Sequence, residues 1–222
     1  MLNKSFYVLI FILVASSYAL AKCNFEVELV FAIDASSEIT KNEFDFLKIA
    51  LSSFINSSFI DPSNYGIGIF TFADRLKLVH NLNENFDKTE IISKIIDMEL
   101  SKNKFPKMLN LALKFSKFLF DSQDISDRVR IGVIITNGEL PLEAIRSLRK
   151  EANSLKNTCH LVALHVGNNP SMILKLLVSK PDYVLESIFD LKKVISNILD
   201  SLCKKQNPKI NRLSWSRFNL KN

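Results

Sequence analysis

A strand-like apolar run that ends in a carboxylate and hydroxyls is the part of this sequence best suited to chemistry. Residues 29–33 are all apolar, and they lead directly into Asp34, Ser36, Ser37 and Glu38. In open parallel α/β sheets, ligands bind in the crevice beyond the carboxyl ends of the strands. This run therefore marks a candidate functional face that carries oxygen ligands. A purely structural role is the alternative, because Asp34, Ser36 and Ser37 can cap local backbone donors or the next helix without any ligand.

The elements that must position these side chains alternate between apolar runs of strand length and amphipathic helical patterns. Strands are predicted at residues 27–33, 66–72, 76–80, 130–136, 160–166 and 183–186, with helices between most of them. Such alternation is typical of a parallel sheet with helices on both faces. Only a short connection near Asp74 joins the second and third strands, and a parallel pair needs a longer crossover. The predicted fold is therefore α/β: a three-layer, doubly wound, mostly parallel six-stranded sheet with one antiparallel edge strand and helices on both faces.

Two of the predicted helices carry apolar residues at helical spacing. The first helix has one apolar face, formed by Phe44, Leu47, Leu51, Phe54 and Ile55. The last pattern repeats at steps of three and four, at Ile188, Leu191, Ile195, Ile198 and Leu202. Both faces are expected to be buried.

The order of elements and three short motifs resemble the von Willebrand factor type A domain over residues 25–203. Asp34-x-Ser36-x-Glu38 resembles the family's Asp-x-Ser-x-Ser motif, which helps to hold a Mg²⁺ through which an acidic group of a partner protein binds. Ile135-Thr136-Asn137-Gly138 resembles the family's strand ending in Thr-Asp-Gly, and Leu164-His165-Val166-Gly167-Asn168 resembles its Gly-Val-Gly-Asn segment. The resemblance implies a binding module whose partner surface lies at or near Asp34.

The metal site that the resemblance implies is degraded in this chain. Glu38 stands in place of the second serine, and Asn137 stands in place of the aspartate on the third loop. On the second loop, aligning residues 105–113 with the family's Gly-Gly-Thr-x-Thr-Gly-x-Ala-Leu puts Lys107 at the threonine that would bind metal. Mg²⁺ needs six oxygen donors in near-octahedral geometry, and an ammonium group has no lone pair to give. Asp34 and Ser36 are the positions that match metal ligands; no cofactor is expected, and Mg²⁺ is the alternative.

Lys107 has two interpretations. Its ammonium group could occupy the region of the missing ion, paired with Asp34 and Glu38, or it could point into solvent from an exposed loop. Counting Lys107, the ligand-binding set implied by the resemblance is Asp34, Ser36, Glu38, Lys107 and Asn137.

The beginning of the chain has the pattern of a secretion signal. Lys4 precedes an apolar run, and Ala19-Leu20-Ala21 ends it, which is typical of a cleaved signal peptide. A signal anchor is the alternative, although the run is short for a membrane span of about 20 residues. We therefore expect a signal peptide at residues 1–21, a type A-like domain at 22–203 and a tail at 204–222. No later segment is apolar for long enough to cross a membrane.

The basic residues are concentrated in that tail. The net charge is +6, and the segment after Cys203 contains six basic residues and no acid. The rest of the expected mature chain is close to neutral, so a globally basic nucleic-acid binder is not expected. Basic residues interleaved with aromatics can attach to sulfated polysaccharides, anionic membranes or an acidic partner surface. The tail residues concerned are Lys204, Lys205, Arg212, Trp215 and Arg217, and a solvated extension without a ligand is the alternative.

Three cysteines in an exported chain allow one disulfide, with three pairings. Type A domains often join their two ends by a disulfide, so the resemblance favours Cys23–Cys203. Cys159 lies beside a predicted strand and is expected to be a small buried hydrophobe. Intermolecular pairing through Cys159 is the alternative.

Asn56-Ser57-Ser58 matches the acceptor sequence for N-glycosylation in a secreted context. The motif is short enough to occur by chance. A glycan on Asn56 would cover the end of the first predicted helix.

Catalytic signatures are weak. The sequence contains no Gly-x-Ser-x-Gly nucleophile elbow and no glycine-rich phosphate loop. Its histidines, His80, His160 and His165, show no spacing typical of zinc sites. We therefore predict a secreted protein that is not an enzyme and that binds an extracellular matrix or cell-surface protein. The alternative is a protein that binds glycosaminoglycans or anionic surfaces through its tail.

Overall fold

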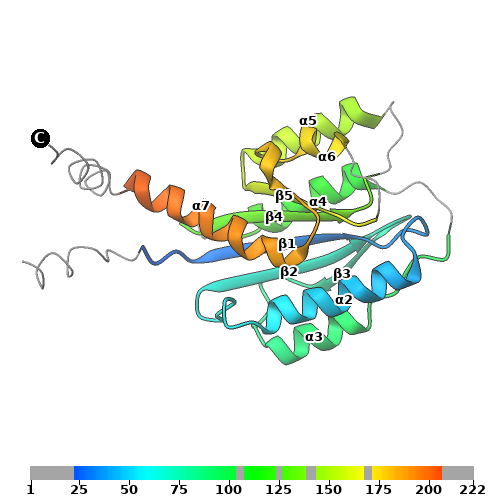
Figure 1. Ribbon diagram of the computed structural model, residues 1–222, viewed down its shortest axis with the longest axis horizontal. Coiled ribbons are helices and arrows are strands. Elements are labelled where there is room, and N and C mark those ends of the chain that lie inside the picture. Colours follow the sequence, from blue (N-terminus) through cyan, green and yellow to red (C-terminus); the bar gives the residue numbers. More distant parts are fainter. Residues whose placement is uncertain (1–22, 104–107, 124–126, 139–143, 168–171, 207–222) are drawn as a thin grey trace, which may run out of the picture.

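The computed structural model describes residues 23–103, 108–123, 127–138, 144–167 and 172–206. The expected signal peptide, Lys107 and the tail residues Arg212, Trp215 and Arg217 lie outside these ranges. The described residues form layers of helices packed on a central sheet (Figure 1). None of the described helices is long and apolar enough to cross a membrane.

The sheet has six strands in the order β3-β2-β1-β4-β5-β6. Neighbouring strands are parallel except for β2 and β3, which are antiparallel. The prediction of a mostly parallel sheet with an antiparallel edge strand is therefore confirmed. The strands are β1 Val27–Asp34, β2 Tyr65–Phe72, β3 Leu76–His80, β4 Val129–Thr136, β5 His160–His165 and β6 Val184–Leu185. All of β1 is buried, as expected of a central parallel strand covered on both faces.

Helices cover both faces of this sheet. In Figure 1, α2 and α3 lie on one side of the sheet, and α4, α5 and α6 lie on the other. The α-helices are α2 Lys41–Asn56, α3 Lys88–Ile96, α4 Leu109–Asp121, α5 Ile145–Lys156, α6 Met172–Leu177 and α7 Leu191–Gln206. Two short 3₁₀ turns, η2 Pro181–Tyr183 and η3 Ile188–Asp190, flank β6. The apolar face predicted for the first helix is buried, and Ile188, counted with the last helix, belongs to η3.

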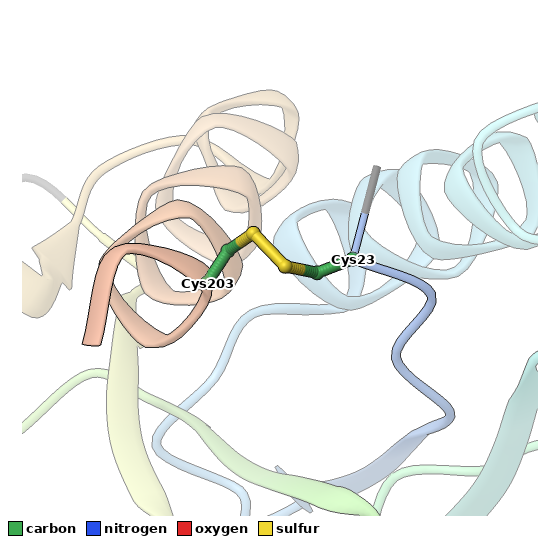
Figure 2. Close-up of a disulfide and its surroundings, with 2 residues drawn as sticks. All are labelled: Cys23 and Cys203. Atoms are coloured by element: carbon green, nitrogen blue, oxygen red, sulfur yellow. A yellow bond between two sulfur atoms is a disulfide. The ribbon is translucent and has the colours of Figure 1, made fainter. Parts of the chain in front are cut away.

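A disulfide joins the two ends of the described chain. Cys23 and Cys203 are bonded, with their Cα atoms 5.8 Å apart and a sequence separation of 180. Figure 2 shows the bond running from the segment before β1 to the last turns of α7. This is the pairing that the family resemblance implies.

Cys159 is the remaining thiol, and it is buried next to the start of β5. Burial raises the pKa of this thiol to about 12. The reactive thiolate is therefore scarce at pH 8. We expect Ellman's reagent to modify Cys159 about 100-fold more slowly in the native protein than in denaturant. Cys159→Ser should remove the signal seen in denaturant, and rapid stoichiometric labelling of the native protein would contradict the burial of Cys159.

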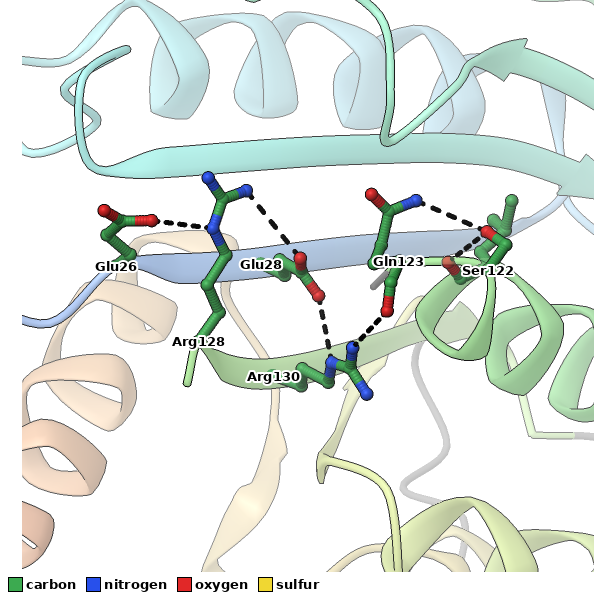
Figure 3. A network of polar contacts seen from close by, with 7 residues as sticks. Glu26, Glu28, Ser122, Gln123, Arg128 and Arg130 are labelled. Carbon is green, nitrogen blue, oxygen red and sulfur yellow. Dashed lines mark hydrogen bonds and ion pairs between the residues drawn. The ribbon is translucent and has the colours of Figure 1, made fainter. Parts of the chain in front are cut away.

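A carboxylate is buried inside the sheet at the end opposite the candidate functional face. Glu28, on β1, is 0% exposed, and its Oε2 accepts a hydrogen bond from Nε of Arg130 on β4 at 3.0 Å. Nη1 of Arg128 lies 3.7 Å from Glu28 Oε1. Figure 3 shows both guanidinium groups reaching Glu28, with Glu26 on the outer side of Arg128. The buried charge is therefore paired across two adjacent strands.

Candidate functional site

The ends of three parallel strands meet at one edge of the sheet. β1 ends at Asp34, β4 at Thr136 and β5 at His165, and these three strands are consecutive neighbours. The backbone N–H of Ala35 continues the pairing to β2 by donating to the carbonyl oxygen of Phe72 at 2.9 Å. This is the edge at which ligands bind in open α/β sheets.

Asp34 is the buried centre of this edge. Its side chain is 0% exposed. Oδ1 accepts a hydrogen bond from the backbone N–H of Ser36 at 3.0 Å. Oδ2 accepts one from the hydroxyl of Thr136 at 2.7 Å. The second bond crosses from β1 to β4, so Asp34 holds its own loop and also joins two strand ends.

Ser36 and Glu38 differ in burial. Ser36 is 2% exposed, and its Oγ has no hydrogen-bond partner among the residues that the structure describes. Glu38 is exposed. A buried hydroxyl without a partner costs free energy unless a ligand, ion or water satisfies it. Ser36 is therefore the described side chain at this edge with the clearest unused bonding capacity.

Helix α2 is capped at its N-terminus by Thr40, which was not predicted from the sequence. The hydroxyl of Thr40 accepts from the backbone N–H of Glu43 at 3.3 Å, and the carboxylate of Glu43 accepts from the backbone N–H of Thr40 at 2.9 Å. This is a capping box. Because Thr40 caps α2, Asp34 and Ser36 are not needed for that purpose, and this part of the structural alternative is wrong. The local cap from Asp34 to the Ser36 N–H is present.

Asn137 follows Thr136 on a tightly held turn. Its backbone carbonyl oxygen lies 3.1 Å from Nε2 of His165, a contact that fits the tautomer with a proton on that nitrogen. The backbone N–H of Gly138 donates to the hydroxyl of Thr136 at 3.2 Å. Gly138 has φ of 71°, in the left-handed region that glycine tolerates best. The half-buried side chain of Asn137 is thus held at the same edge as Asp34.

A second carboxylate at this edge was missed by sequence reasoning, which treated Asp74 only as part of a connection. Asp74 accepts hydrogen bonds from the hydroxyl of Ser101 at 3.0 Å and from the side-chain amide of Asn103 at 2.8 Å. The bonds from Asn103 and Ser101 lower the pKa of Asp74. The backbone N–H of Ser101 also donates to the carbonyl oxygen of Ala35 at 2.7 Å, which ties the segment to the loop after β1. The available signal was that Asp74 lies two residues after the end of the buried strand β2.

We call Asp34, Ser36, Glu38, Asp74 and Asn137 the carboxyl edge. Asp34, Ser36 and Asn137 had been predicted to lie together, and the structure brings them to neighbouring strand ends. Lys107 lies outside the described residues, so its pairing with Asp34 and Glu38 stays a prediction.

The donors fit a magnesium site only in part. The carboxylate of Asp34 and the hydroxyl of Ser36, which has no partner within the described ranges, are suitable ligands for a hard cation. Both oxygens of Asp34 already accept hydrogen bonds, and the amide of Asn137 brings no charge. Among the described residues of the carboxyl edge, Asp34 and Ser36 are the ones that match the metal ligands of the family motif.

Thr136→Val is expected to lower the free energy of unfolding by about 2 kcal/mol. The substitution keeps the shape of the side chain but removes the hydroxyl that donates to Oδ2 of buried Asp34 and accepts from the N–H of Gly138. Urea denaturation would measure the loss. Thr89→Val, at an exposed position of α3, is the control and should change stability by less than about 0.5 kcal/mol. Equal effects of the two substitutions would contradict the role given to Thr136.

The chain is similar in sequence to a known domain family and to two matrilins. The family model of the von Willebrand factor type A domain matches residues 28–197. Matrilin-1 of Bos taurus is 26% identical over 191 residues, which cover 79% of this chain and 33% of matrilin-1. Matrilin-3 of Gallus gallus is 22% identical over 193 residues, which cover 81% of this chain and 41% of matrilin-3. The chain thus spans about a third to two fifths of the length of these relatives.

Solved structures share the fold. Proximal thread matrix protein 1 from the mussel byssus superimposes with a TM-score of 0.66 at 21% identity, covering 82% of this chain and 48% of that chain. The manganese-loaded TRAP protein of Plasmodium vivax gives a TM-score of 0.65 at 19% identity, covering 78% of this chain and 73% of that chain.

Proposed function

The chain belongs to the von Willebrand factor type A domain family. From that premise we propose that it is a secreted module, and that it binds another extracellular protein through its carboxyl edge. The partner would be a matrix or cell-surface protein, and the role is binding rather than catalysis. The observation that carries this proposal is the convergence of Asp34, Ser36 and Asn137 at neighbouring strand ends. Asp34 and Ser36 are buried at this edge, and Ser36 Oγ has no hydrogen-bond partner among the described residues. Exposed Glu38 and half-buried Asn137 offer a carboxylate and an amide to a partner.

An extracellular location is part of the proposal. The disulfide between Cys23 and Cys203 supports it, because disulfides form and persist in oxidising compartments. The proposed mature chain begins at Lys22, after removal of the signal peptide. Asn56 is exposed at the end of α2, so its side chain is accessible for glycosylation. A shift in mass on treatment of the secreted protein with an endoglycosidase, lost in Asn56→Gln, would test that modification.

We propose further that binding does not depend on a fully competent Mg²⁺ site. Support comes from the substitutions at two of the family's ligand positions, Glu38 and Asn137. Calorimetric titration of Mg²⁺ and Mn²⁺ into the mature chain would test this, with Asp34→Asn as the control. No heat of binding at millimolar Mg²⁺ is the expected result. Strong Mg²⁺ binding that Asp34→Asn abolishes would reject this part and would favour metal-bridged capture of an acidic partner residue.

Partner binding itself is testable with an array of purified extracellular matrix and cell-surface proteins. The mature chain should bind at least one of them equally well in Mg²⁺ and in EDTA. The double variant Glu38→Ala/Asn137→Ala should weaken that binding about ten-fold or more, the loss expected for central interface residues. Asp182→Ala is the matched control, because Asp182 is exposed on η2 at the opposite end of β6. Equal binding by both variants would reject the carboxyl edge as the partner surface.

A second candidate function is attachment to a sulfated polysaccharide at the other end of the molecule. His160 supplies the specific observation: burial lowers its pKa, and the charges of Lys180 and Lys205 lower it further. Lys180 and Lys205 therefore lie close enough to His160 for their charges to act on it, near the start of the tail. If this function holds, a chain that ends at Gln206 should lose most of its binding to heparin, and salt should weaken the binding steeply. The Glu38→Ala/Asn137→Ala variant should then bind heparin normally.

A further inference from the structure

A histidine and two glutamates converge at the edge of the sheet, away from the carboxyl edge. His80 is the last residue of β3, Glu84 lies in the turn that follows, and Glu90 lies on α3. One ligand atom from each of these side chains lies within 4.8 Å of the other two. Sequence spacing gave no sign of this group, because it needs the fold to bring α3 against β3.

An ammonium group already sits among these three ligand atoms. Nζ of Lys94 is 2.7 Å from Glu84 Oε2 and 2.7 Å from Glu90 Oε1. It is also 3.4 Å from Nδ1 of His80. His80 Nδ1 lies 3.0 Å from Glu84 Oε2. The space between the three side chains therefore already holds a positively charged group, the ammonium of Lys94.

The charges of the group are not balanced by that lysine. Glu84 and Glu90 carry two negative charges, and Lys94 returns one positive charge. Nδ1 of His80 faces the carboxylate of Glu84 and the ammonium group of Lys94. Metal binding uses the neutral imidazole with its lone pair on this nitrogen. A divalent cation in place of the ammonium group would neutralise the two carboxylates.

We propose that His80, Glu84 and Glu90 form a binding site for Zn²⁺, and that Lys94 fills the site with its ammonium group when no metal is bound. One imidazole with two carboxylates suits zinc, whereas magnesium prefers oxygen ligands alone. A fourth ligand, water, completes the tetrahedron. The site thus differs in its chemistry from the all-oxygen carboxyl edge.

The two glutamates are exposed enough to reach the spacing that zinc ligands require. Zinc ligands at 2.0–2.2 Å from the metal stand about 3.4 Å apart. His80 Nδ1 and Glu84 Oε2 are already 3.0 Å apart, and all three ligand atoms lie within 4.8 Å of one another, so side-chain shifts of about 1 Å bring them to this spacing. The side chains of Glu84 and Glu90 are 44% and 54% exposed, which leaves them free to move, whereas His80 at 1% is fixed. Lys94 is 32% exposed and can turn toward solvent when the ion enters.

The site is expected to be weak compared with a structural zinc site. In the bound form Nε2 of His80 carries the imidazole proton. That nitrogen is buried, and within the described part of the chain it has no hydrogen-bond partner. Histidines that bind metal firmly donate their second N–H to a carboxylate or carbonyl. Release of Lys94 from its ion pairs lowers the affinity further.

Calorimetric titration of ZnCl₂ into the mature Asp34→Asn chain tests the proposal, because this background removes the carboxyl edge as a competing zinc binder. Lys94→Gln should raise the affinity for Zn²⁺ about ten-fold or more, since the competing cation is gone. Glu90→Gln should lower it about ten-fold or more in the same background. Glu186→Gln, an exposed glutamate on another part of the molecule, is the matched control and should leave it unchanged.

Three results would overturn the proposal: no zinc binding by the Lys94→Gln chain, no gain in affinity from Lys94→Gln, or no loss from Glu90→Gln. The substituted positions are partly or well exposed, and the thermal midpoint without zinc checks that each variant is folded. Zinc should also raise the thermal midpoint of the Lys94→Gln chain, because the ion ties β3 to α3. Failure here leaves the carboxyl edge proposal intact, since Asp34 takes no part in this site.

Discussion

Replacing Arg130 with methionine is expected to lower the free energy of unfolding by about 3–5 kcal/mol. Glu28 is fully buried within β1, and Arg130 donates the hydrogen bond to its Oε2. Oε1 of Glu28 has no hydrogen-bond partner among the described residues, so Arg130 provides most of the local compensation. Its removal leaves a buried carboxylate beside a single, more distant guanidinium. Urea denaturation at pH 7 would measure the loss.

Two further variants separate the buried charge from simple loss of packing. Arg128→Met removes the more distant guanidinium, 3.7 Å from Glu28, and should cost less than about 1 kcal/mol. The double variant Glu28→Met/Arg130→Met removes both charges and should recover most of the stability, because apolar replacements of a buried pair are often neutral. If Arg130→Met costs no more than Arg128→Met, the buried pair in Figure 3 is not what stabilises this end of the sheet.

The loss of stability caused by Arg130→Met should grow as the pH rises. Burial raises the pKa of Glu28 above its ordinary value of 4.5, and Arg130 opposes that rise. Without Arg130 the folded-state pKa rises further, so the native state binds its proton more tightly than the unfolded state does. Stability then falls as pH rises above about 4.5. Arg130→Met should therefore be closest to the parent protein at pH 4, where Glu28 is mostly protonated in both the folded and the unfolded state. A loss of stability that is constant with pH would contradict this account.

The positions of the strands could be predicted because their physical cause is local. Each central strand of a parallel sheet is covered on both faces, so its sequence is a nearly continuous run of apolar residues. The antiparallel edge strand followed from the short connection at Asp74, which cannot carry a parallel crossover. The core of the fold is therefore encoded in short stretches of sequence.

Pairs of charged residues could not be predicted in the same way. Glu28 interrupts an apolar strand and would ordinarily be read as exposed, yet its partner Arg130 lies 102 residues later. The burial of Glu28 is explained by the register of β1 against β4, which places Glu28 opposite Arg130. This register cannot be read from the sequence. His80 and Lys94 present the same difficulty, since β3 and α3 must pack before their side chains can meet.

The candidate site shows both situations side by side. Asp34 and Ser36 could be named because they follow a buried strand directly. Asp74 also follows a buried strand, but it was read as a turn residue, and its bonds to Ser101 and Asn103 arise from a segment more than 20 residues away. Residues at strand ends can be found from sequence, whereas the loops that fold over them depend on tertiary contacts.

Removal of the disulfide, by Cys23→Ser together with Cys203→Ser, is expected to lower the free energy of unfolding by roughly 4 kcal/mol. The bond closes a loop of 180 residues, so it restricts the unfolded chain strongly. The folded state should change little, because Leu191, Ile195 and Ile198 keep α7 docked through their buried side chains. Cys159 remains as the thiol in both proteins, which keeps the comparison matched.

Urea denaturation with and without reductant tests this expectation. Reductant should bring the parent protein to the stability of the double serine variant, and it should leave that variant unchanged. If the parent and the variant differ by less than about 1 kcal/mol, the closed loop contributes little, and the entropic account of this bond is wrong. A full difference would support the entropic account of the bond, which joins α7 to the segment before β1 (Figure 2). The carboxyl edge lies at the other end of β1, so its geometry should survive in the folded variant, and the array assay should return unchanged partner binding.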